Sequence, residues 1–84
     1  MITKSQTKKA KSFIYSVDLS RIKQVVDNIN FNPREKRIIQ YMLDKKTIKE
    51  IAIELNLSLS YVAYLKQVIY QKIYIYLELE NKNN

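Results

Sequence analysis

The apolar residues of this chain recur at the three- and four-residue spacing of helices that bury one face. The first stripe follows i, i+3, i+4 and i+7 and consists of Ile22, Val25, Val26 and Ile29. It predicts a helix over roughly residues 18–30. Residues 13–17 fit either a short extended segment or an early helical turn, and the pattern leaves both open.

A second helix is predicted over residues 33–45 by the signals at its start. Asn32 can cap it, Pro33 suits the first helical position, and Glu35 in the first turn favours the positive end of a helix. Its apolar face consists of Ile38, Ile39, Met42 and Leu43.

Polar residues in the middle of the chain mark a third helix, a turn and the start of a fourth helix. Thr47 and Glu50 have the spacing of a capping box, which places the start of the third helix at Ile48. Asn56 tolerates the left-handed backbone that a tight turn needs, and Ser58 can cap the helix that follows.

The apolar positions around that turn are spaced for two helices that cross closely. Ala52 is small where the second helix must approach, Leu57 can fill the corner, and Val62 begins the next buried stripe. This arrangement is typical of a helix-turn-helix, which places its second helix in the major groove of DNA. An ordinary helical hairpin without a nucleic-acid role is the alternative.

The last predicted helix is long, because no Gly or Pro interrupts the chain from Leu59 to about Glu80. About twenty residues at a rise of ~1.5 Å extend roughly 30 Å. The face expected to pack on the domain is formed by Val62, Leu65, Ile69, Ile73 and Tyr76. A second stripe is formed by Tyr61, Val68, Ile75 and Leu79.

That second stripe has the near-heptad spacing with which one helix packs on another. It predicts a homodimer that forms through Val68, Ile75 and Leu79. In the alternative interpretation, the end of the helix frays or folds back on the first helix.

The first twelve residues contain Lys4, Lys8, Lys9 and Lys11, no acid and almost nothing to bury. They predict a flexible basic arm over residues 1–12, which either contacts DNA phosphates or acts as a solubilising tail. Residues 13–84 are expected to form one domain. We predict an all-α fold, a small bundle of about four helices with a helix-turn-helix and a long C-terminal helix.

Composition narrows the classes of function. The 84 residues include fifteen Lys and Arg against eight Asp and Glu, a formal net charge of +7, which favours polyanionic partners. The sequence has no Cys, His or Gly, so it lacks thiolate and imidazole groups and the glycine-rich loops that bind phosphate. Its carboxylates are scattered. We therefore expect no enzyme, no metal site and no cofactor.

No stretch approaches the roughly eighteen apolar residues of a membrane span, and the N-terminus lacks the apolar core of a signal peptide. A cytoplasmic, nucleoid-associated protein without membrane contact is expected.

Several motifs occur in a familiar order: Asn32-Pro33-Arg34-Glu35, Lys49-Glu50-Ile51-Ala52, Leu55-Asn56-Leu57-Ser58 and Val62. Over about residues 20–75 the chain resembles region four of bacterial RNA polymerase sigma factors, and the related LuxR-type output domain. The resemblance implies binding to promoter DNA through the last helix and contact with RNA polymerase. We expect no room for the other sigma regions, so the chain fits a free-standing regulator of bacterial or phage type, or a polymerase adaptor.

The last helix departs from the sigma pattern. Positions that carry Arg, Glu and Gln in sigma factors are here Leu59, Ser60, Tyr61, Ala63 and Tyr64. Without an Arg for guanine, an AT-rich site is favoured. The expected contacts at the bases are Ser60, Tyr64 and Gln67, with Tyr61 beside them, and those at phosphates are Ser58, Lys46, Lys49 and Lys66.

The sequence thus predicts a sequence-specific DNA-binding transcription regulator that binds AT-rich promoter or operator DNA. The alternative is a protein-interaction module that binds polymerase or another regulator and keeps the fold without reading bases. Tyr side chains on the last helix suit both functions, because Tyr is enriched at protein interfaces and also stacks on nucleic acid. RNA binding is a third and weaker interpretation, since the chain has no RNA-binding signature.

Overall fold

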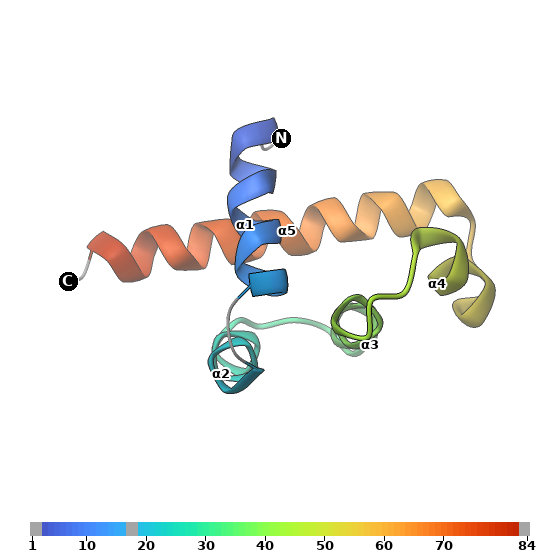
Figure 1. Cartoon of the computed structure of the whole chain (residues 1–84), viewed down its shortest axis with the longest axis horizontal. Helices are drawn as coiled ribbons and strands as arrows, with labels where there is room; N and C mark the ends of the chain where they lie inside the picture. Colours follow the sequence, from blue (N-terminus) through green and yellow to red (C-terminus); the bar gives the residue numbers. More distant parts are fainter. Residues whose placement is uncertain (1–2, 17–18, 83–84) are drawn as a thin grey trace.

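The computed structural model describes residues 3–16 and 19–82, and every regular element in those ranges is a helix (Figure 1). The helices are α1 (Lys4–Ser16), α2 (Leu19–Asn28), α3 (Pro33–Leu43), α4 (Ile48–Leu55) and α5 (Leu59–Lys82). The predicted all-α class is confirmed, with five described helices in place of about four. None of these five combines the length and the apolar character needed to cross a membrane.

α5 forms the long axis of the molecule. Its 24 residues extend about 36 Å at the usual helical rise, and the longest dimension of the molecule is 41 Å. α1 crosses α5, α2 and α3 lie on one side of it, and α4 lies at its N-terminal end (Figure 1). The predicted inner face of α5 is confirmed, because Tyr76 is half-buried and four other residues are buried: Val62, Leu65, Ile69 and Ile73.

The predicted start and turn signals are present. Asn32 and Thr47 are the N-caps of α3 and α4, and each forms a reciprocal capping box with the Glu three residues later. Asn56 has φ 55° and ψ 48°, the left-handed backbone expected of the turn. The Ser58 hydroxyl accepts a hydrogen bond from the backbone N–H of Tyr61 at 3.1 Å. These local predictions are confirmed.

The corner between α4 and α5 is packed by the residues that the sequence predicts there. Ala52 and Val62 are buried in the same core cluster, and Leu57 packs against that cluster from the turn. The backbone N–H of Leu57 also bonds the carbonyl of Ala52 at 2.9 Å, which closes the end of α4. The chain therefore breaks at Asn56 instead of continuing as one rod.

Helix α1 corrects the prediction of a flexible arm over residues 1–12. Residues 4–12 belong to α1, and only residues 1 and 2 lie outside the described ranges. Thr3 and Gln6 form a capping pair, since each side-chain oxygen accepts the backbone N–H of the other residue. Ala10 and Ile14 are buried where α1 packs on α5. The open segment 13–17 is helical through residue 16, and Val17 lies outside the described residues.

Two predicted boundaries shift slightly. α2 covers residues 19–28 of the expected 18–30, and residue 18 lies outside the described ranges. α3 ends at Leu43 rather than at 45, because Lys45 takes a left-handed backbone with φ 62°. The backbone N–H of Lys46 then bonds the carbonyl of Tyr41 at 3.0 Å, which closes the helix end.

Glu35 is the one buried charged residue of the described chain, with 3% of its surface exposed. Its Oε1 accepts the backbone N–H of Asn32 at 3.0 Å, and both carboxylate oxygens accept Lys72 Nζ at 2.9 Å. Lys72 belongs to α5, and its Nζ lies 5.5 Å from the centre of the Phe31 ring. A buried charge is tolerated when its oxygens are paired in this way, so the start of α3 is tied to the middle of α5.

We expect Glu35→Ala to lower the free energy of unfolding by about 2–3 kcal/mol, because it removes a helix cap and leaves Lys72 without its charge partner. Denaturation by urea, followed by far-UV circular dichroism, measures this loss. Glu50→Ala is the matched control, since it removes the same capping carboxylate from α4 at an exposed position. Equal losses in the two variants would contradict a contribution from the ion pair.

Candidate nucleic-acid interface

The outer face of α5 presents three of the residues that the sequence assigned to DNA bases. Ser60, Tyr64 and Gln67 are exposed, and 61% of the Tyr64 surface is accessible. Val62 and Leu65 of the same turns are buried, so packing fixes the rotation of the helix. The result is an uncharged exposed stripe over the first turns of α5.

Tyr61 lies beside this stripe and connects it to α3. An Arg34 guanidinium nitrogen donates to the Tyr61 hydroxyl at 3.4 Å, and the guanidinium carbon lies 5.9 Å from the ring centre. The rings of Tyr61 and Tyr64 stack with centroids 6.3 Å apart. Arg34 was not predicted as a site residue, because nothing in the local spacing of residues indicates that the start of α3 lies beside the start of α5.

Gln67 lies where α1 crosses α5. The Thr7 hydroxyl donates to Gln67 Oε1 at 3.3 Å. Sequence reasoning missed this contact as well, since it treated residues 1–12 as an arm. The contact marks the end of the stripe, because α1 crosses α5 in this region (Figure 1).

The residues assigned to phosphates lie near the start of α4, at the start of α5 and on α5 itself. Lys49 and Ser58 are exposed and Lys46 is half-buried, all near the start of α4 or α5. Ser58 combines two roles, since its hydroxyl oxygen caps α5 while the hydroxyl hydrogen can still donate to an anion. A shallow hollow between α4 and α5 is lined by Lys49, Ala52, Ile53, Asn56, Leu57 and Leu59.

Lys66 is a half-buried cation on the flank of α5. Burial, and after it the positive charge of Lys11, lowers the pKa of the Lys66 ammonium. No carboxylate of the described residues lies within ion-pair distance of either ammonium. Among the described residues, the two side chains therefore form a region of positive charge without an ion-pair partner.

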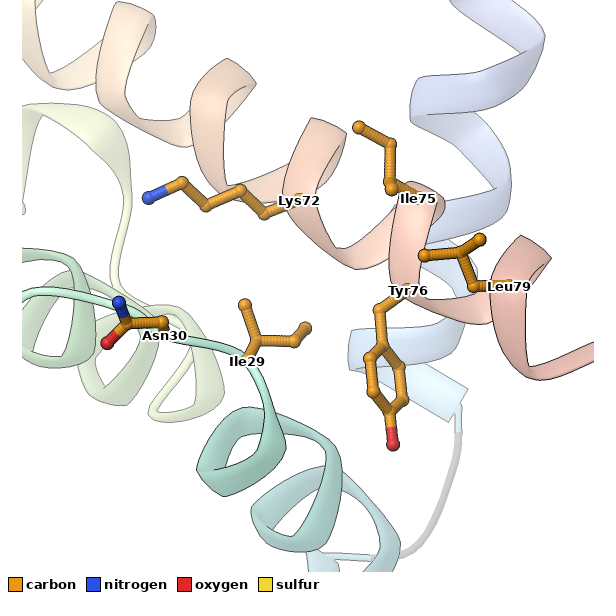
Figure 2. A pocket seen from close by; sticks show the side chains of 6 residues that line it. All are labelled: Ile29, Asn30, Lys72, Ile75, Tyr76 and Leu79. Atoms are coloured by element: carbon orange, nitrogen blue, oxygen red, sulfur yellow. The ribbon is translucent and has the colours of Figure 1, made fainter.

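The predicted dimer residues lie toward the other end of α5. Ile75 and Leu79 are 48% and 56% exposed, whereas Val68 is half-buried. Ile75, Leu79 and Tyr76 border a shallow, mainly apolar groove whose opposite side is formed by Ile29 and Asn30 (Figure 2). Tyr61, at the start of the same stripe, is held by Arg34 instead.

Several carboxylates in the described part of the chain have structural partners. Glu35 pairs with Lys72, Glu78 pairs with Lys9 at 2.7 Å, and Glu80 pairs with Arg21. The described residues contain no group of three or more carboxylate, imidazole or thiol side chains placed to share a metal ion.

Comparison with known proteins gives no relative for this chain, since no protein-family model, no curated protein and no solved structure matches it.

We expect Lys66→Met to raise the thermal unfolding midpoint at pH 7, because it removes a charge that is unfavourable to bury and keeps an apolar stem of similar length. The pKa of Lys66 is lowered from its usual value of 10.5, so the folded state holds this proton less tightly than the unfolded state. The penalty is full below the folded pKa and fades as the pH rises through it.

The difference between Lys66→Met and the unchanged chain should therefore shrink between pH 7 and pH 10. Circular dichroism melts at the two pH values measure it. The exposed Lys49→Met serves as the control, with no gain expected at either pH. A less stable Lys66→Met at pH 7 would contradict this electrostatic assignment.

Proposed function

We propose that the chain is a sequence-specific DNA-binding transcription regulator that binds an AT-rich duplex through the first turns of α5. One observation carries the proposal. The uncharged, exposed stripe of Ser60, Tyr64 and Gln67 lies between cations on both flanks, with Arg34 on one side and Lys66 on the other. Such a surface offers base contacts in the middle and phosphate contacts at its edges.

In this proposal α4 and α5 act as a helix-turn-helix. α5 lies in the major groove, which is wide enough for a helix, and α4 crosses the backbone. The Gln67 amide suits the N6 and N7 edge of adenine, and the Tyr64 ring offers apolar surface to a thymine methyl. α5 itself has no Arg for guanine, which supports a preference for AT-rich sequence.

The resemblance to sigma region four supports a promoter as the target. Its motifs coincide with features of the fold, because the Glu35 cap, the Thr47–Glu50 cap and the Asn56 turn all lie in the matching segment. A cytoplasmic location on the nucleoid and contact with RNA polymerase belong to the same proposal.

Selection of bound duplexes from random DNA, at two salt concentrations, tests the proposal directly. We expect enrichment of AT-rich sequences and an affinity that falls steeply with salt. Binding that ignores DNA, survives high salt and requires a protein partner would instead support the protein-interaction module.

We expect Lys46→Gln/Lys49→Gln to weaken binding evenly across sequences and to reduce the salt slope by about 1.8, at ~0.9 for each phosphate that is no longer neutralised. Tyr64→Ala should change sequence preference and leave the salt slope unaltered. Fluorescence anisotropy on the selected duplex and on a shuffled duplex measures both effects. Lys9→Gln/Lys23→Gln is the control of equal charge, because Lys9 pairs with Glu78 and Lys23 lies on α2.

The partner of the apolar groove is, in our proposal, a second copy of this chain. The ridge of Ile75 and Leu79 and the hollow beside Ile29 lie on the same face (Figure 2), so a two-fold axis can place each ridge in the hollow of the other copy. A dimer also matches DNA sites built of two half-sites.

Sedimentation equilibrium should then give about twice the mass of the chain at micromolar concentration, and Ile75→Lys/Leu79→Lys should give the mass of one chain. Both substituted positions are exposed, so the helices should persist by circular dichroism. A single-chain mass for the unaltered protein at high micromolar concentration would rule out the dimer.

A further inference from the structure

Helix α1 has an exposed basic side. Lys8, Lys11, Ser12 and Tyr15 line a shallow hollow on α1, and Lys11 is close enough to Lys66 of α5 to lower the pKa of that ammonium. Within the described residues, neither Lys8 nor Lys11 has a carboxylate at ion-pair distance.

The packing of α1 keeps this side turned away from the core. Ala10 and Ile14 are buried, and the Thr7 hydroxyl bonds Gln67, which together fix how α1 lies on α5. Lys9 has a different role, because its ammonium pairs with Glu78 at 2.7 Å and lies 5.7 Å from the centre of the Tyr74 ring. Lys9 is thus a structural residue, whereas Lys8 and Lys11 have no ion-pair partner among the described residues.

Uncompensated ammonium groups held on a helix are suited to an anion with several oxygens. Each Lys offers three donors, and Lys8 and Lys11 line the same hollow. Folding brings Lys11 and Lys66 together at an electrostatic cost, and a bound anion between them would relieve that cost.

Among polyanions, a nucleic-acid backbone fits the position best. Thr7 contacts Gln67, the last residue of the stripe that we assign to base contacts. The basic side of α1 is thus continuous with the surface proposed to face DNA, and a backbone that borders the groove would pass it.

We propose that Lys8 and Lys11 of α1, together with Lys66 of α5, form a phosphate-binding surface that holds the DNA backbone beside the groove occupied by α5. This inference rests on the proposed function, and it assigns to the N-terminal helix a direct role in binding. The interaction is with phosphate alone, so it carries affinity and no sequence information.

The test compares Lys8→Gln/Lys11→Gln with the control Lys9→Gln/Lys23→Gln, which removes equal charge and includes a Lys of the same helix. Fluorescence anisotropy on a duplex from the selection, over a range of salt concentrations, gives affinity and salt slope. For the first variant we expect affinity to fall roughly tenfold and the slope to fall by about 1.8 on every sequence, against little change in the control.

Lys8→Arg/Lys11→Arg keeps both positive charges and should keep the salt slope of the unaltered chain. This variant therefore shows whether the effect of Lys8→Gln/Lys11→Gln comes from the lost charge or from a disturbed fold. Equal slopes for Lys8→Gln/Lys11→Gln and the unaltered chain would overturn this inference while leaving the proposed function intact. Absence of any salt-dependent duplex binding by the unaltered chain would overturn both.

Two further probes separate other sources of phosphate. Vesicles of equal parts phosphatidylserine and phosphatidylcholine should bind the unaltered chain and Lys8→Gln/Lys11→Gln alike. If the variant loses vesicle binding but keeps the salt slope on DNA, the surface binds lipid and the inference is overturned. Inorganic phosphate, at constant ionic strength, should displace the duplex only weakly; displacement at micromolar concentration would overturn the inference in favour of a free-phosphate site.

Discussion

The buried carboxylate of Glu35 is the constraint on which the arrangement of the other helices depends. A charge at 3% exposure needs partners close by, and these come from the residue that caps α3 and from the middle of α5. Because the positions of both oxygens are fixed by Lys72, the start of α3 cannot slide along α5. Arg34, the neighbouring residue, is thereby kept beside Tyr61.

α5 serves as a common support for elements that are far apart in sequence. α1 packs on one flank and α3 on another, and the exposed stripe runs between them. The charges that border the stripe therefore arise from three different helices: Arg34 from α3, Lys49 from α4 and Lys66 from α5 itself. A surface assembled in this way depends on tertiary packing, so it exists only in the folded chain.

Short-range features of this fold could be predicted from the sequence, whereas its long-range contacts could not. The caps at Asn32 and Thr47 and the turn at Asn56 depend on residues within four positions of each other, and each was found. Helix α1 was missed although Thr3 and Gln6 have capping spacing and Ala10 and Ile14 share a face, because four lysines outweighed this short apolar pattern.

The contacts that shape the candidate site were missed for a different reason: Glu35 and its partner Lys72 lie 37 residues apart, and the pairs Arg34–Tyr61 and Thr7–Gln67 join residues 27 and 60 positions apart. No periodicity within one helix contains such information, because it depends on how the helices are placed against one another.

The chain has no Gly, yet a residue with positive φ lies in each of the two connections of α4: Lys45 follows the end of α3, and Asn56 is the C-cap of α4. A residue with a Cβ has only a narrow left-handed well, whereas Gly in the same place would permit a broad range of torsions. The backbone torsions are therefore more restricted at these two positions than they would be with Gly. We therefore expect the orientation of α4 relative to α5 to vary little, so that the surface at the start of α5 is already formed before a partner binds.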